Sequence, residues 1–230
     1  MKKCTFNICC LKVGEKYHHD YVNILYNSCN RFCNENFDFY LFTEDENNPN
    51  INKNIKIKKI KTEENIYGWW YKLLLLSDDI FYENSINLYL DLDIVIINSI
   101  SKFFMEGNKI FMPLDWIEKE KNIYNSSVMV WNSNMLFLKD IWKNFLKNKN
   151  EIIENFRGDQ EYISEIYKEN IESIPEEWCK SFKEVFIEKK DKLSEKTSII
   201  VFHGYPKPHD VILNNIEEEN FQPWIRNFWR

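Results

Sequence analysis

The chain has 230 residues, enough for one sizeable core, and we expect a single domain over residues 1–230. Hydrophobic residues make up 44% of the sequence and aromatic residues 16%, which excludes a disordered chain. Acidic residues (36) outnumber basic ones (30) for a net charge of −6, which argues against a general nucleic-acid-binding protein.

Targeting and redox signals are weak. No apolar run reaches the roughly 20 residues that a membrane-spanning helix needs. The N-terminal segment "MKKCTFNICCLKVGEK" starts basic, but its apolar part soon meets Lys12 and lacks a small-residue cleavage site. The six cysteines form no CxxC pair and mostly stand in apolar segments, which is typical of buried thiols in a reducing compartment. We therefore expect a cytoplasmic protein without a transmembrane segment.

Strand and helix patterns alternate in the first part of the chain. The runs "TFNICCLKV" (5–13) and "FDFYLFT" (37–43) predict buried strands, and the alternation in "IKIKKI" (55–60) predicts an edge strand. Between the first two strands, an apolar stripe at i, i+3, i+4 and i+7 predicts an amphipathic helix. The stripe consists of Val22, Leu25, Tyr26 and Cys29. The leucine-rich run "YGWWYKLLLLSDD" (67–79) predicts a buried helix.

The alternation continues to the end of the chain. Four further strands are predicted: "INLYLDLDIVI" (86–96), "KIFMPLDW" (109–116), "SSVMVWN" (126–132) and the start of "TSIIVFHGYPKPHD" (197–210). Ser133 is a predicted cap for a helix whose apolar face holds Leu138, Ile141, Trp142 and Phe145. "GDQEYISEIYKE" (158–169) opens another helix, and we expect Trp131 and Trp142 to be core residues. This order predicts an α/β fold with a largely parallel central sheet.

Two aspartates interrupt the apolar run "NLYLDLDIVI" (87–96). In a continuous strand, residues i and i+2 share a face, so Asp91 and Asp93 would lie side by side. Unpaired buried carboxylates are costly, so a cation is expected between them. That cation is either a Lys or Arg side chain in a structural network or a divalent metal, because carboxylate oxygens suit Mg²⁺ or Mn²⁺.

A second cluster lies in "VFHGYPKPHD". His203 follows an apolar strand, and α/β sheets bind ligands at the carboxyl ends of their strands. An imidazole added to the carboxylates favours Mn²⁺ modestly over Mg²⁺. Lys207 could reach a phosphate oxygen as a point charge. His203 alone would more often be a hydrogen-bonded core histidine, but its combination with Gly204, Lys207 and the aspartate pair favours a binding site.

A third polar cluster lies in "RGDQEY". Asp159 and Gln160 stand at the predicted start of a helix, after Gly158. An aspartate at this position often does no more than cap the helix, and the sequence leaves this interpretation open beside a functional one.

Several motifs together resemble a known family in order and spacing. They are "GWWYKLLLL", "YLDLDIVI", "NSSVMVWN", "GDQEYI", "SFK" and "VFHGYPKPHD". The set resembles glycosyltransferases of the A-type fold, akin to family 8 and related bacterial and viral polysaccharide-type enzymes. The resemblance implies a single catalytic domain with a Rossmann-like, mostly parallel central sheet flanked by helices.

The resemblance also implies a donor, a cofactor and site residues. The donor would be a nucleotide sugar, usually a UDP-sugar, whose diphosphate is held by Mn²⁺, with Mg²⁺ as the second candidate. The implied metal ligands are Asp91, Asp93 and His203, and Asp91 would also contact the ribose. The other implied donor-binding residues are Tyr17, Thr43, Lys72, Gly204 and Lys207. Asn125 would line the acceptor region, with Asp159 and Gln160 as catalytic candidates.

The chemistry implied by the family is transfer with retention. No obvious nucleophile stands out beyond Asp159 and Gln160, so front-face transfer is the expected mechanism. The sequence departs from the family loop His-x-x-Gly-x-x-Lys-Pro, because Gly204 follows His203 directly, and Ser127 stands where relatives commonly have Gly. The implied acceptor is a carbohydrate or a lipid-linked sugar, with nucleic acid as a minor option.

Two other functions fit parts of the sequence. Haloacid-dehalogenase-type phosphatases carry DxDx(T/V) after an apolar strand, which would make Asp91 a nucleophile, although that motif normally lies on the first strand. "GDQEYI" also lacks the second acid that such enzymes need. The other alternative is a non-catalytic module that binds a nucleotide sugar or a glycan, against which the joint presence of the metal and phosphate residues argues.

Overall fold

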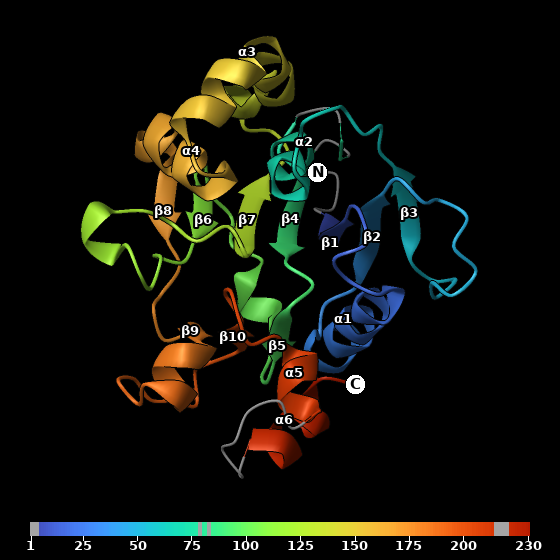
Figure 1. Cartoon of the computed structure of the whole chain (residues 1–230), viewed down its shortest axis with the longest axis vertical. Helices are drawn as coiled ribbons and strands as arrows, with labels where there is room; N and C mark the ends of the chain where they lie inside the picture. The colour runs from blue at the N-terminus through green and yellow to red at the C-terminus, as the bar shows by residue number, and fades with distance from the viewer. Residues whose placement is uncertain (1–4, 78–79, 82–83, 214–220) are drawn as a thin grey trace.

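The computed structural model describes residues 5–77, 80–81, 84–213 and 221–230, which form two sheets with helices around them. The large sheet has the strand order β3-β2-β1-β4-β7-β6-β8 and the small sheet the order β5-β10-β9. Figure 1 shows the small sheet below the large one, with α3 and α4 at the opposite end of the molecule. The site described below lies between the two sheets.

The bounds of the elements are as follows. The large sheet contains β1 (Thr5–Lys12), β2 (Phe37–Thr43), β3 (Lys56–Lys59), β4 (Ser85–Leu90), β6 (Ile110–Met112), β7 (Val128–Asn132) and β8 (Ile171–Ser173). The small sheet contains β5 (Ile94–Ile96), β9 (Cys179–Ser181) and β10 (Ile199–Val201). The helices are α1 (His19–Phe32), α2 (Lys72–Leu75), α3 (Ile141–Asn155), α4 (Asp159–Ile166), α5 (Pro208–Ile212) and α6 (Phe221–Phe228).

The large sheet is mostly parallel, as predicted. β1 pairs in parallel with β2 and β4, β2 with β3, and β6 with β8, whereas β7 runs antiparallel to both β4 and β6. Successive residues of β1 enter different cores: Ile8 and Cys10 pack with α1, whereas Cys9 packs with the apolar residues of α2, α3 and α4. A strand covered on both faces needs a continuous apolar run, which explains the composition of "TFNICCLKV".

Most of the sequence-predicted elements are confirmed. β1, β2, β7, β10, α1 and α4 lie where the patterns placed them, and β3 lies at the edge of the large sheet. Trp131 is buried, whereas Trp142 is half-buried beside the same core. The described cysteines are free thiols, and all except the half-buried Cys33 are buried. Within the described residues, no helix combines the length and apolar character needed to cross a membrane.

The strand predicted over 86–96 is wrong as a continuous element. β4 ends at Leu90, β5 begins at Ile94, and the two belong to different sheets. Asp91, Leu92 and Asp93 therefore form the connection between the sheets, and the shared-face expectation for the two aspartates does not hold. In this connection, Asp91 pairs with Lys72 and Asp93 with Lys207.

Two predicted helices also need correction. The run 67–79 forms a 3₁₀ turn over Gly68–Tyr71 followed by the single-turn α2, and residues 78–79 lie outside the described residues. Ser133 caps no helix, because α3 begins only at Ile141; its hydroxyl instead accepts a hydrogen bond from the Ser85 amide at 3.0 Å. In both places tertiary contacts outweigh the local helical pattern.

Candidate active site

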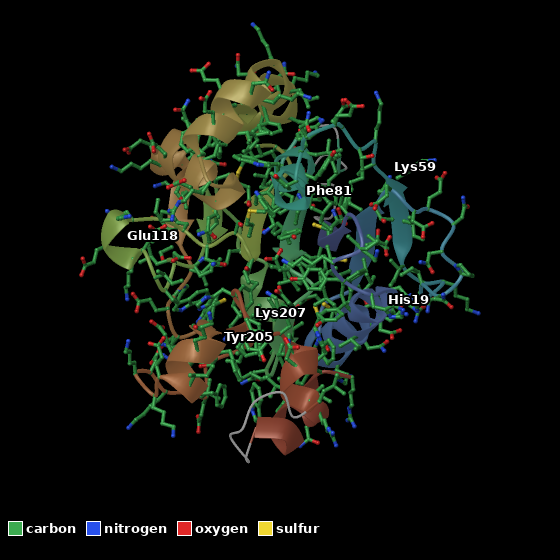
Figure 2. All side chains as sticks on the ribbon, viewed as in Figure 1. His19, Lys59, Phe81, Glu118, Tyr205 and Lys207 are labelled. Atoms are coloured by element: carbon green, nitrogen blue, oxygen red, sulfur yellow. The ribbon has the colours of Figure 1, made fainter. Side chains whose placement is uncertain are left out.

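A cavity of about 460 Å³ lies beyond the carboxyl ends of β1 and β4, where the small sheet meets the large one. All the predicted site residues except Thr43 line it. They are Tyr17, Lys72, Asp91, Asp93, Asn125, Asp159, Gln160, His203, Gly204 and Lys207. Lys207 and Tyr205, labelled in Figure 2, lie near the middle of the molecule, close to the small sheet. The structure thus brings together residues that are far apart in the sequence.

Lys72 is the first residue of α2 and is 6% exposed. Its ammonium lies 3.0 Å from Asp91 Oδ1, 3.0 Å from Ser126 Oγ and 3.2 Å from the Ser126 carbonyl oxygen. Burial lowers the pKa of Lys72, but the nearby carboxylates of Asp159 and Asp91 outweigh it and raise this pKa above its ordinary value. The lysine is therefore a permanent buried cation at the back of the cavity.

Asp91 directly follows β4 and is held from several sides. Its amide donates to the Ser127 carbonyl oxygen at 2.9 Å, and the Tyr89 hydroxyl donates to Oδ1 at 2.6 Å. Burial raises the pKa of Asp91, but Lys72 and the hydrogen bond from Tyr89 outweigh it and keep this pKa below its usual value. Asp91 is therefore ionised at neutral pH.

Asp93 links the two sheets through its partners. Its Oδ2 accepts a 2.7 Å hydrogen bond from the Tyr17 hydroxyl and forms an ion pair with the Lys207 ammonium. Lys207 also donates to the Phe202 carbonyl oxygen at 3.0 Å, and its own amide donates to Asp210 at 2.8 Å. Tyr17 precedes α1 and Lys207 precedes α5. Through these two partners, Asp93 connects the starts of both helices to the segment between the sheets.

Asp159 opens α4 and is 4% exposed. Its Oδ2 has no hydrogen-bond partner in the described residues, and the nearest cation, Lys72 Nζ, is 3.8 Å away. Burial raises the pKa of Asp159 above its usual value. A buried acceptor without a donor is uncommon in folded proteins, and a ligand hydroxyl at this wall of the cavity would satisfy it.

Gln160, the next residue of α4, is fixed by a side chain that the sequence analysis missed. Its amide nitrogen donates to Asp115 Oδ2 at 3.3 Å, and Asn125 donates to the same oxygen at 3.2 Å. Asp115 is buried and follows β6. A polar residue after the apolar run "IFMP" was the signal that could have revealed it.

His203 follows β10 and presents one ring nitrogen to the cavity wall. Its Nε2 lies 2.7 Å from Ser181 Oγ, and its ring stacks on Trp116 with an interplanar angle of 5°. Burial, and then the charge of Lys183, lower the pKa of His203 below its ordinary value, so the imidazole is neutral. No hydrogen bond to Nδ1 is found among the described residues, which leaves that nitrogen for a ligand.

Gly204 has a φ of 69°, in the left-handed region that glycine adopts without strain. A Cβ built there would lie 3.2 Å from Lys183 Nζ. The backbone angle therefore favours glycine here, and a side chain would also press on the Lys183 ammonium.

The first cavity contains the types of side chain that bind a divalent metal ion. Asp91, Asp93 and His203 line one cavity and offer carboxylate oxygens and an imidazole nitrogen, the ligands that Mn²⁺ takes. In the described part of the chain, the group with three candidate ligand atoms within 4.8 Å of one another is instead His18, His19 and Asp20. The residues therefore fit a metal by chemistry, and coordination would require Asp93 to exchange the Lys207 ammonium for the ion.

A second cavity of about 470 Å³ adjoins the first. The residues that line both are Trp69, Asn125, Asp159, Gln160, His203 and Gly204. Trp69 is 42% exposed and stacks on Tyr67 with ring centroids 5.0 Å apart. Lys183 lines only the second cavity; it ends the motif "SFK" that carries part of the resemblance, but it was not among the predicted site residues.

Thr43 is the predicted site residue that lies apart from the others. It is buried at the end of β2, its hydroxyl accepts a 3.2 Å hydrogen bond from the Asp45 amide, and it does not line the first cavity. Its role in donor binding stays a prediction.

The arrangement of the two sheets and their helices is shared with solved glycosyltransferases, which confirms the resemblance at the level of fold. The galactosyltransferase LgtC, solved with donor and acceptor sugar analogues, superposes with a TM-score of 0.70 at 13% identity, over 97% of this chain and 96% of LgtC. GlyE of Streptococcus pneumoniae gives a TM-score of 0.70 at 14% identity, over 98% of this chain and 60% of GlyE. The bifunctional glycosyltransferase WbbM gives 0.59 at 12% identity, over 97% of this chain and 51% of WbbM. Neither a protein-family model nor a curated protein sequence matches the chain.

Proposed function

We propose that the chain is a metal-dependent glycosyltransferase that transfers a sugar from a nucleoside diphosphate sugar, preferably a UDP-sugar, to an acceptor hydroxyl. The observation that carries this proposal is the content of the first cavity. It holds two carboxylates and an imidazole for a divalent ion, two lysines for phosphate oxygens, and one unsatisfied buried carboxylate oxygen for a sugar hydroxyl.

The chain's own residues divide the work between them. Asp91, Asp93 and His203 would hold Mn²⁺, which supplies positive charge to the departing diphosphate when it is bound. Lys207 lies on the same side as His203 and would turn from Asp93 to a phosphate oxygen. Asp159 would accept a hydrogen bond from a hydroxyl of the transferred sugar, which fixes the sugar ring against α4.

The acceptor would enter through the second cavity. Asp159 and Gln160 line both cavities, so a sugar held there lies between the donor and acceptor sides. The half-exposed ring of Trp69 offers an apolar face for a carbohydrate. We therefore favour a carbohydrate acceptor, free or lipid-linked, and transfer with retention by front-face attack.

The geometry of Asp91 argues against the phosphatase alternative. A nucleophilic carboxylate needs an accessible oxygen, but Tyr89 bonds to Asp91 Oδ1 and Lys72 contacts both oxygens, at 3.0 Å and 3.3 Å. Asp91 is thus held as a fixed anion rather than left free for attack, and a metal ion would have to share its Oδ2 with the Lys72 ammonium.

The proposal is tested by thermal unfolding of the protein with a panel of nucleotide sugars, each with and without Mn²⁺, followed by donor hydrolysis and transfer assays. We expect selective stabilisation by one donor that depends on the metal. Asp93→Ala and His203→Ala should each abolish metal-dependent turnover, whereas His18→Ala, in the exposed histidine cluster outside the cavity, should not. Wild-type turnover in the Asp93 or His203 variant would refute the metal site, and no turnover of any donor would favour the binding module.

A further inference from the structure

Lys183 places a positive charge next to the loop that carries His203. It opens the π-helical turn Lys183–Ile187, two residues after β9, and lines the second cavity with His203 and Gly204. Its ammonium lies so close to Gly204 that a Cβ at that glycine would be 3.2 Å away. π-Helical turns are rare and often occur at functional sites.

Lys183 lacks a carboxylate partner among the described residues, as does Lys16 at the first cavity, whereas the other cations around the two cavities have one. Lys72 pairs with Asp91, Lys207 pairs with Asp93, and Arg157 pairs with Glu118 and Glu161. Among the described residues, Lys183 Nζ forms no ion pair, and Glu188 at the end of its own turn pairs with Lys190 at 2.7 Å. The charge of Lys183 is therefore available to a ligand.

The surroundings indicate which ligand this charge serves. The second cavity is also lined by the carboxylates of Asp115, Glu118, Asp159 and Glu161. Arg157 lines that cavity too and pairs with Glu118 and Glu161, so an acidic acceptor there would meet the like charges of Asp115 and Asp159. In the first cavity, Asp91 and Asp93 are balanced by Lys72 and Lys207. An anion held there against Gly204 would lie next to Lys183, because the absence of a side chain lets a phosphate approach the backbone.

We propose that Lys183 is a catalytic residue that stabilises the departing diphosphate of the nucleotide-sugar donor. This inference rests on the proposed function. In the step concerned, the bond between the anomeric carbon and the β-phosphate oxygen breaks, and its electron pair goes to that oxygen. The acceptor oxygen bonds to the anomeric carbon, and its proton passes to the departing phosphate oxygen.

Negative charge on the diphosphate grows as this bond breaks, so a cation beside it stabilises the transition state more than the bound donor. The charge of Lys183 should therefore act on kcat more than on donor affinity. It should also act more on the affinity for the product diphosphate than on that for the donor.

The test uses Lys183→Met, Lys183→Arg and, as a control, Lys190→Met, an exposed lysine a few residues further along the chain. We expect Lys183→Met to lower kcat for donor hydrolysis about 10- to 100-fold, as loss of one such electrostatic contact does, with KM for the donor changed less than about threefold. Titration calorimetry with inorganic pyrophosphate and Mn²⁺ should show an affinity about tenfold weaker. Lys183→Arg should recover most of both, and Lys190→Met should change neither. Thermal unfolding verifies that each variant is folded.

Three outcomes would overturn the inference. The first is unchanged kcat and pyrophosphate affinity in folded Lys183→Met. The second is unchanged donor hydrolysis with a raised KM for the acceptor, which would assign Lys183 to the acceptor instead. The third is a wild-type protein that turns over no donor, yet binds pyrophosphate through Lys183. That result refutes the proposed function itself and leaves Lys183 an anion contact without a catalytic role.

Discussion

The two sides of the cavity hold their lysine–aspartate pairs differently. On the side of the large sheet, Lys72 is enclosed by groups from three parts of the chain: Asp91 after β4, Ser126 before β7 and Asp159 in α4. On the side of the small sheet, Lys207 comes from the loop after β10 and contacts one carboxylate and one carbonyl. The first pair is part of the buried framework, whereas the second lies on a loop where a ligand can take the place of either partner.

The largest effect we expect is the loss of stability in Lys72→Met. This change leaves Asp91 and Asp159 without their buried cation, and breaking a buried ion pair costs about 3 kcal/mol. Lys59→Met is the matched control, because Lys59 pairs with Glu46 at 2.7 Å on the exposed edge strand β3 (Figure 2), and its loss should cost less than about 1 kcal/mol. Urea unfolding of both variants gives the comparison. Equal losses would contradict the buried role of Lys72.

The next effect concerns Lys207→Met, which we expect to raise the affinity for Mn²⁺ in the absence of a donor about tenfold, or about 1.4 kcal/mol. The physical reason is competition, because the Lys207 ammonium and the ion would share the same oxygen of Asp93. The affinity for the nucleotide sugar should fall, because a phosphate contact is lost. Titration calorimetry measures both.

A matched control for Lys207→Met is Lys180→Met, since Lys180 forms a part-buried ion pair with Asp191 outside the first cavity. It should leave Mn²⁺ affinity unchanged. Weaker Mn²⁺ binding in Lys207→Met would contradict the exchange of partners at Asp93.

The smallest effect, and the one with a defined pH dependence, is expected for Asp159→Asn. Burial raises the pKa of Asp159, so the ionised form is disfavoured by folding. Its ionisation therefore destabilises the protein as the pH rises from the ordinary aspartate pKa through the raised one, and has no effect below both. The Asp159→Asn variant should melt about 2–4 °C higher at pH 7, which corresponds to a gain of about 1 kcal/mol in the free energy of unfolding. This gain should disappear below about pH 4.

Asp159→Asn should also lower the rate of sugar transfer, because the carboxylate is proposed to bind a hydroxyl of the transferred sugar. A gain in stability with a loss of activity is a common trade-off at functional sites. Calorimetric scans at pH 7 and at low pH check the first expectation and transfer assays the second. A gain in stability that is the same at both pH values would show that the carboxylate's charge is not its cause.

The sequence predicted most of the large sheet because those strands are coded locally, whereas β8 was not predicted. β1 and β2 are continuous apolar runs bounded by polar residues, so their positions follow from the pattern alone. The two sheets could not be told apart in the same way. The apolar run over 86–96 contains a change of sheet at Asp91 that the sequence does not reveal. Both halves of the run are buried, and an apolar pattern does not specify which strand each half pairs with.

The site was predictable where residue chemistry sits in a recognisable motif, and not elsewhere. Asp91, Asp93, His203 and Lys207 stood out because charged groups are rare at the ends of buried strands. Lys183 stands in the motif "SFK", but a lysine in a helical turn is usually an exposed residue, and its place beside the cavity follows from its position over Gly204. The pairing of the aspartates with two different lysines also depends on tertiary contacts alone.

The break in the strand at Asp91 gives the middle residue of the Asp-Leu-Asp motif a mechanical part. Leu92 is 2% exposed and belongs to a core that contains residues of both sheets, while it also lines the cavity together with the two aspartates. Its packing therefore anchors the connection between the two sheets, and a smaller side chain at this position would loosen the segment that carries both carboxylates.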